Sequence, residues 1–411
     1  MLHSPYTPDQ LARYAGVAID RCFDMRPGEL LLVNYEPEHR PLAVALAEAA
    51  YRRGLRVDGM VTDMLVQRAE VDHASDDVLG RMPPWRRARF VARTEAGTAL
   101  IIVDGQTDPD ALATSDPERI ALRYRRQAEQ LSELFERLEA NLDTSLIIAY
   151  PTLAWARRAY PELQPDAAQR ALAGDILSFC RIGPDDGPGD DALDRHIDTL
   201  RDRAATANRL RLREVRLRGP GTDLRVELTD DAVWTSADET NAHGRTYLGN
   251  LPTEEIYTSP AASATEGEAA CTMPLAWQGR LYEDLRLEFR SGRLVRLDAR
   301  TDAQRDALLG LLDVDEGGRR LGEVALVDRS SRIGQRGRLY WSTLLDENRA
   351  CHIALGSGFP GCRARGQSSP DLNSSRTHND VVIGSSEVDV VGTTAAGETV
   401  PLIVDGDWRP S

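Results

Sequence analysis

The chain has 411 residues, of which 41% are hydrophobic and 28% charged, and its formal net charge is −15. This length allows two domains with separate cores, and the composition is that of an ordinary globular protein. The negative charge argues against a surface for nucleic acid or anionic membrane, because such a surface needs a basic face.

The cysteines and the N-terminus indicate the cellular compartment. The five cysteines are odd in number and widely spaced, and no CxxC pair occurs. This usage favours free thiols in a reducing environment. The first residues lack the basic segment and apolar core of a signal peptide, and no apolar run approaches the roughly 18 residues of a membrane span. We therefore expect a cytoplasmic protein.

The first half of the chain alternates strands and helices. Apolar residues at 30–35 and 55–62 predict strands, and the helical pattern at 41–53 lies between them. This βαβ unit favours a parallel sheet with helices on its faces. No phosphate-binding glycine motif follows the first strand, so the pattern implies no nucleotide. Two further strands and a long charged helix are expected at 99–103, 145–149 and 117–142.

A run of Gly, Pro and Asp at 183–191 is the best linker candidate. It predicts an α/β N-terminal domain at 1–185 and a catalytic, metal-binding domain at 186–411. A helix at 191–212 opens the second domain, which is expected to be α+β and strand-rich. Its expected strands and one clear helix lie at 214–218, 223–228, 281–289, 293–299 and 302–312.

Two histidines and an aspartate in the second half are candidate metal ligands. His378 and Asp380 stand two positions apart, and in an extended segment this spacing points both side chains to one face. The alternative is a polar strand or loop edge. His352 precedes the apolar residues 353–355. In that setting a hydrogen-bonded core histidine is the alternative to a ligand.

Carboxylates accompany these histidines. Glu323 precedes an apolar run, where burial of its charge is costly unless it is paired or metal-bound. The alternative is a strand-end charge that faces water. Glu254 and Glu255 follow Pro-Thr, which suits a helix N-terminus, although residues 256–258 favour a strand. Together, these carboxylates and imidazoles are the ligand types of a hydrolytic site with one or two divalent metals.

The blocks around these residues give a resemblance to a known family. The chain resembles the thermophilic aminopeptidase T family (M29) of dinuclear metalloaminopeptidases. The resemblance covers nearly the full length, and the ordered set of C-terminal motifs is specific. The motifs that carry it in the second half lie at 250–260, 315–327, 345–348, 352–356 and 373–380.

The resemblance implies a homodimer of two-domain subunits, each with two divalent ions. Zinc or cobalt is expected, with manganese or iron as alternatives. By position, the implied metal ligands are Glu255, Glu323, His352, His378 and Asp380. Glu255 is favoured over Glu254 as the ligand, although the sequence does not separate them. Glu254 and Glu323 are the candidate catalytic carboxylates.

The chain departs from the family at one position. The family has Tyr where this chain has Phe359, seven residues after His352. A phenol there can ligate metal or stabilise an oxyanion, and losing one such donor costs about 2.7–4 kcal/mol in barrier. Tyr340 is a candidate substitute from elsewhere in the chain. Cys351 and Cys362 are expected to be a buried thiol and a loop thiol rather than ligands.

The leading hypothesis is an aminopeptidase that releases N-terminal residues from peptides or small amino-acid-derived substrates. The alternative from another enzyme class is a mononuclear non-haem iron dioxygenase, related to dihydroxypyridine ring-cleaving enzymes, with His352, His378 and Asp380 as its triad. The additional carboxylates argue against this alternative, because a mononuclear site does not need them. A third hypothesis, motivated by Phe359, is a family member with weakened or specialised activity.

Overall fold

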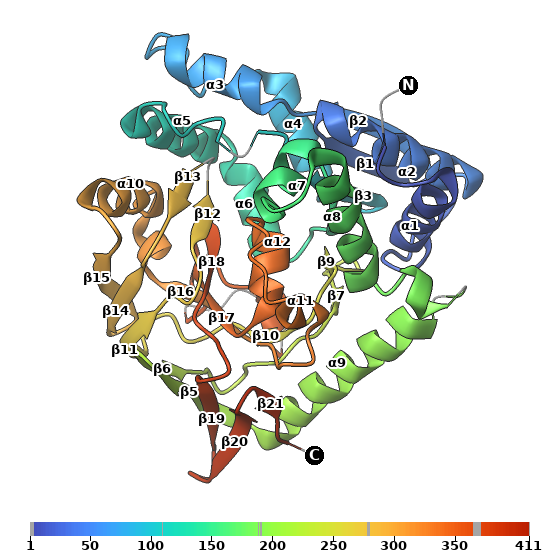
Figure 1. Ribbon diagram of the computed structural model, residues 1–411. Helices are drawn as coiled ribbons and strands as arrows, with labels where there is room; N and C mark the ends of the chain where they lie inside the picture. The colour runs from blue at the N-terminus through green and yellow to red at the C-terminus, as the bar shows by residue number, and fades with distance from the viewer. Residues whose placement is uncertain are drawn as a thin grey trace.

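The computed structural model describes residues 4–108, 110–187, 189, 191–277, 280–364 and 371–410. It confirms the expected fold class. A parallel sheet with helices forms in the first half, and antiparallel sheets dominate the second (Figure 1). None of the described helices combines the length and apolar character needed to cross a membrane.

The first sheet has the order β2-β1-β3-β4-β9, and all its pairs are parallel. Its inner strands β1, β3 and β4 are largely buried apolar runs, as expected of a sheet covered on both faces, whereas the edge strand β2 is mostly exposed. The last strand, β9, comes from beyond the expected linker and pairs with β4. The domain boundary at 185 therefore remains a prediction. The strands are β1 (Leu30–Tyr35), β2 (Arg56–Val61), β3 (Thr98–Asp104), β4 (Ser145–Ala149) and β9 (Asn250–Leu251).

Helices accompany this sheet, and several of them begin at a residue whose side chain caps the first turn. In the first helix, the Thr7 side chain accepts a hydrogen bond from the Gln10 backbone N–H, and the Gln10 side chain accepts one from the Thr7 backbone N–H. This reciprocal pair satisfies two backbone groups that a helix start otherwise leaves unpaired. The helices are α1 (Pro8–Asp20), α2 (Arg40–Arg52), α3 (Met64–His73), α4 (Pro84–Ala92), α5 (Pro117–Gln130), α6 (Ser132–Glu139), α7 (Leu153–Ala159) and α8 (Pro165–Phe179).

Two expected elements are divided in the structure. The single helix expected at 117–142 is two helices, α5 and α6, because Leu131 (φ −99°, ψ 16°) leaves helical geometry between them. The strand expected at 281–289 is also two, β13 (Arg280–Tyr282) and β14 (Arg286–Arg290). Asp284, in the left-handed region (φ 55°), turns the chain between them. Apolar periodicity does not report such local breaks.

The second half begins with α9 (Asp191–Leu210), the long helix at the lower right of Figure 1. Pro188 and Asp190 of the expected linker lie outside the described residues. After α9 comes an eight-stranded antiparallel sheet of order β15-β14-β11-β6-β5-β19-β20-β21. Its strands are β5 (Leu212–Gly219), β6 (Thr222–Glu227), β11 (Thr265–Ala270), β14 (Arg286–Arg290), β15 (Arg293–Asp298), β19 (Asp389–Thr394), β20 (Thr399–Val404) and β21 (Asp407–Trp408).

A smaller antiparallel sheet carries the candidate site. Its order is β10 (Ile256–Thr258), β16 (Leu321–Leu326), β17 (His352–Gly356) and β18 (His378–Val382). Every residue of β10, β16 and β17 is buried, so both faces of these strands are covered. The remaining elements are β7 (Asp238–Thr240), β8 (Thr246–Leu248), β12 (Leu275–Trp277), β13 (Arg280–Tyr282), α10 (Asp302–Leu312), α11 (Arg332–Gln335) and α12 (Thr343–Asp346).

Candidate metal centre

Strand register brings distant blocks of the sequence to one face of the small sheet. Glu323 on β16 pairs with Ala354 on β17, which pairs with Asp380 on β18. Directly paired residues of antiparallel strands point to the same side. Two pairs further along, and therefore on the same face, His378 lies opposite Gly356. The central strand therefore places two small residues between the polar side chains, and this leaves room for ions.

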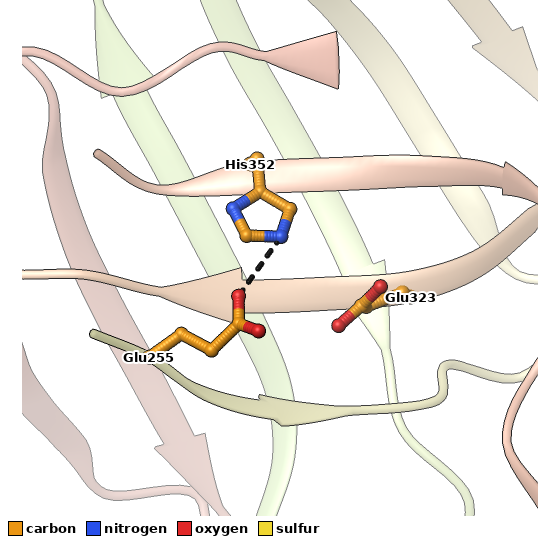
Figure 2. Close-up of side chains that lie close together, drawn as sticks. All are labelled: Glu255, Glu323 and His352. Carbon is orange, nitrogen blue, oxygen red and sulfur yellow. Dashed lines mark ion pairs between the residues drawn. The ribbon is translucent and has the colours of Figure 1, made fainter. Parts of the chain in front are cut away.

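The first cluster joins Glu255, Glu323 and His352, whose ligand atoms all lie within 4.8 Å of one another. Figure 2 shows the three side chains converging, with His352 Nε2 3.1 Å from Glu255 Oε2. Glu255 Oε2 is buried, and no hydrogen bond to a described residue satisfies it. A buried carboxylate oxygen and an imidazole nitrogen this close form an ion pair when the imidazole is protonated and suit a cation between them when it is neutral.

The second cluster joins Glu323, His378 and Asp380, again within 4.8 Å. His378 Nε2 lies 3.1 Å from Glu323 Oε2 and 3.3 Å from Asp380 Oδ1. The other ring nitrogen, Nδ1, lies 2.7 Å from the Ser357 carbonyl oxygen and donates to it. This bond leaves Nε2 free to face the carboxylates, as in ligand histidines of metal sites. Glu323 belongs to both clusters.

The charges of the clusters compensate one another only in part. Burial raises the pKa of Glu323 to about 7, although His378 opposes the shift. Burial lowers the pKa of His352, but Glu255 and the other carboxylates outweigh it and raise the pKa to about 9. Burial also raises the pKa of Asp380, but His378 outweighs it and brings the pKa to about 2. Oxygen and imidazole donors in such a site suit divalent zinc, cobalt, manganese or iron.

Glu347 joins this site, although sequence reasoning did not select it. Its buried carboxyl group hydrogen-bonds with Asp380 and accepts from Asn250 Nδ2 at 3.2 Å. Burial, and then the charges of Asp380 and Glu255, raise its pKa well above the ordinary value. Glu347 lies in the family-like block 345–348, but nothing in that block separates it from the neighbouring Asp346.

The structure does not bring Glu254 to the clusters. Its carboxylate forms a buried bidentate pair with Arg181, with both N–O distances at 2.8 Å, and accepts from the Arg332 backbone at 3.1 Å. Successive residues of an extended chain point to opposite sides. When Glu255 faces the site, Glu254 therefore faces away. This geometry counts against an acid–base role for Glu254.

Phe359 lies directly against the second cluster. Its ring centroid is 4.9 Å from that of His378 and 5.1 Å from that of Tyr257. Tyr340 does not take its place, because the Tyr340 hydroxyl donates to Asp175 at 2.6 Å and its ring packs on Phe179. The suggestion that Tyr340 substitutes for the family tyrosine is therefore wrong.

The two cysteines near the site are buried and paired with protein groups. Cys351 Sγ donates to the Val327 carbonyl at 3.5 Å, and Cys362 Sγ lies 3.7 Å from Thr235 Oγ1. Burial raises the pKa of Cys351 to about 11 and that of Cys362 to about 12. Both are therefore thiols at neutral pH rather than thiolate ligands.

Both clusters open into a cavity of about 920 Å³. Its lining also includes residues at the carboxyl ends of β1 and β3, among them Glu36 and the segment 104–108. Ligands of open α/β sheets bind outside the carboxyl ends of the strands. The parallel sheet and the small antiparallel sheet thus enclose one space large enough for a peptide-sized ligand.

Comparison with known proteins agrees with this geometry. A family model described as thermophilic metalloprotease (M29) matches residues 7–408. Aminopeptidase 2 of Geobacillus stearothermophilus is 31% identical over 407 residues, which cover 97% of each chain. Aminopeptidase T of Thermus aquaticus is 31% identical over 406 residues, 97% of this chain and 98% of that protein.

A solved structure supports the same relationship. Wild-type AmpT from Thermus thermophilus matches with a TM-score of 0.84 at 31% identity, covering 97% of this chain and 98% of that one. The family match extends over nearly the whole chain, and the curated relatives are named aminopeptidases. The chain therefore belongs to the M29 family of thermophilic metalloproteases and is a metal-dependent aminopeptidase.

Proposed function

We propose that the enzyme releases N-terminal residues from peptides through a dinuclear site. The observation that carries this proposal is the sharing of Glu323 between two ligand clusters. With two ions bound, a carboxylate shared by both clusters would help to hold them at the short separation that two-metal hydrolysis requires. Glu255 and His352 would hold one ion, and His378 and Asp380 the other, with Glu347 beside Asp380.

When bound, the two ions would polarise the scissile carbonyl and lower the pKa of the attacking water. The residues of the chain supply the rest. Glu323 would supply negative charge to both ion positions. The Ser357 carbonyl fixes the orientation of the His378 ring. The phenyl ring of Phe359 keeps one side of His378 apolar. An apolar wall excludes water from the site, and the lower dielectric constant strengthens the electrostatic interactions inside it.

The function is tested with the metal-loaded protein and a panel of aminoacyl anilides and short peptides. We expect release of the N-terminal residue, and no release when the same peptides are N-acetylated. Mass spectrometry of the products reports which bond is cut. If protein with bound metal releases nothing from the whole panel, the proposed function is wrong.

Metal loading should release protons. At pH 7 the metal-free protein carries protonated His352, whose pKa is about 9, and protonated His378, whose pKa is also raised. Both imidazoles must be neutral to bind metal, and Glu323, which is partly protonated at pH 7, must be ionised, so loading expels between about two and three protons and apparent affinity rises with pH. Calorimetry in buffers of different ionisation enthalpy measures this number. Release of no proton would contradict the proposed ligands.

Phe359 supports a second candidate, an aminopeptidase of weakened or specialised activity. Phe359 contacts the ring of His378 at the position where the family has Tyr, and Tyr340, which bonds to Asp175, does not replace it. We expect Phe359→Tyr to raise kcat on a leucine anilide by about 10- to 100-fold, because one oxyanion donor is worth about 100-fold or more. Unchanged kcat at unchanged metal content would show that Phe suits this site.

The dioxygenase alternative is not favoured. A facial triad of His352, His378 and Asp380 would leave Glu255 and Glu323 buried without a function. Oxygen uptake by the iron-loaded protein would reverse this preference.

The expected homodimer and a division near residue 185 remain predictions. Sedimentation tests the homodimer, and limited proteolysis tests the division.

A further inference from the structure

Glu239 is a carboxylate of the cavity wall that neither ligand cluster uses. It lies on β7 directly opposite Tyr247 of β8. The Tyr247 hydroxyl donates to Glu239 Oε2 at 3.1 Å. The Tyr257 hydroxyl also hydrogen-bonds to this carboxylate. Two phenols from different strands therefore fix the position of one carboxylate.

The backbone makes space for this carboxylate at Gly249. A Cβ atom at Gly249 would lie 2.8 Å from Glu239 Oε1, which is closer than such atoms approach. The glycine is therefore required if the carboxylate is to keep its place. This close fit, together with the two phenols, indicates a side chain held in one orientation.

Glu239 has no cationic partner within the described part of the chain. Arg93 is nearby, but its guanidinium is engaged by Asp143, with Nε 2.7 Å from Oδ1, and by Ser145. Burial raises the pKa of Glu239, and the charges of Asp143 and Glu255 add to the shift. An ionised carboxylate in this position is therefore under-compensated and would be stabilised by a cation.

The Glu239 carboxylate and the two ligand clusters share one cavity. Tyr257 pairs with Ala325, which pairs with His352, so the Tyr257 side chain lies on the face of the sheet that carries the clusters. Glu239, Tyr257 and the cluster residues line the same cavity. A molecule bound at the ligand clusters would therefore have Glu239 in the wall of the same cavity.

We propose that Glu239 binds the cationic nitrogen of the substrate's first residue, either its α-ammonium group or a basic side chain. This inference rests on the proposed function and adds the group that recognises the N-terminal residue. The two phenols orient the carboxylate, and the substrate supplies the missing positive charge. An internal peptide bond between neutral residues offers no such cation, so the contact favours cleavage at a free N-terminus.

The test compares Glu239→Gln with Glu139→Gln in the zinc-loaded enzyme. Glu139 lines the same cavity but accepts a hydrogen bond from Ser374, so its variant controls for the loss of one negative charge. We expect kcat/KM of Glu239→Gln to fall about 10- to 150-fold below that of the control, as one charged hydrogen bond predicts. Metal content and Tm show that each variant is loaded and folded.

Two substrates distinguish the source of the cation. A loss on both leucine and arginine anilides assigns the α-ammonium group, and a loss on the arginine anilide alone assigns the side chain. Equal activity of Glu239→Gln and the control on both substrates would overturn the proposal. If Glu239→Gln does not fold, Tyr247→Phe replaces it. It keeps the charge and removes one donor, so a loss of about 2- to 10-fold supports the proposal, and no loss overturns it.

Binding separates this inference from the proposed function. If the wild-type enzyme cleaves neither anilide, the function fails, and calorimetry with leucinol and argininol decides the role of Glu239. Weaker binding of either amine to Glu239→Gln than to Glu139→Gln supports the proposal. Equal binding to both variants, or no binding to the wild-type protein, rejects it.

Discussion

Replacing Glu323 by glutamine should abolish nearly all activity. We expect kcat/KM to fall by at least about 1,000-fold, because the shared carboxylate holds both cation positions and several kcal/mol of transition-state stabilisation depend on them. Gln is nearly isosteric but neutral, so it would bridge two divalent ions poorly. Steady-state hydrolysis of a leucine anilide at saturating zinc measures the loss.

A matched control separates this effect from a general change of charge. Glu268 is an exposed carboxylate on β11, in the large sheet, and Glu268→Gln should keep wild-type kcat/KM. Glu323→Gln should keep the Tm of the metal-free protein within a few degrees, because Glu323 is partly protonated there. Substantial activity of Glu323→Gln in zinc-loaded protein would contradict the shared-ligand assignment.

Glu254→Gln should act on stability far more than on catalysis. The substitution leaves the buried guanidinium of Arg181 without its counter-charge. Breaking such a pair on one side costs about 3–5 kcal/mol of the free energy of unfolding. We expect a lower urea midpoint, with kcat/KM of the folded enzyme within about tenfold of wild type. A general acid or base at Glu254 would instead cost about 100- to 10,000-fold.

The double variant Glu254→Gln/Arg181→Met tests the physical reason. Replacing both partners of a buried ion pair removes the unpaired charge, and such replacements are often neutral. The double variant should therefore regain much of the stability lost in Glu254→Gln. If the double variant is as unstable as the single one, the ion pair is not the cause. A large loss of kcat at normal stability would restore Glu254 as a catalytic candidate.

Regular elements followed closely from the sequence where the local signal was strong. The strands at Leu30–Tyr35 and Ser145–Ala149 and the helix at Asp302–Leu312 have the expected bounds. Their apolar periodicity agrees with their burial. The sequence did not predict the break at Leu131 or the turn at Asp284, because the backbone angles of a single residue do not change the hydrophobic periodicity.

The site was predictable to the extent that its residues carry distinct chemistry. The sequence marks His352 and His378 because histidine is rare in this chain, and it marks Asp380 because it stands two positions after His378. Strand register then brings the three side chains together. Glu347 and Glu239 did not stand out, because one acid among 65 acidic residues has no local signal. Their positions depend on contacts between segments far apart in the chain. Only the folded structure shows such contacts.

The choice between Glu254 and Glu255 illustrates the same limit. Both are acids in one block, and alternation requires only that they face opposite sides. Which side faces the metal cluster depends on Arg181 and Asn348, which hold Glu254 and its backbone from the other side. Neither contact is visible in the block itself.

The most direct test is the number of divalent ions bound per chain. Native mass spectrometry of the zinc-loaded protein, with elemental analysis of the same sample, should give two ions for the wild-type chain. A single ion per wild-type chain at saturating zinc would contradict a dinuclear site built around Glu323.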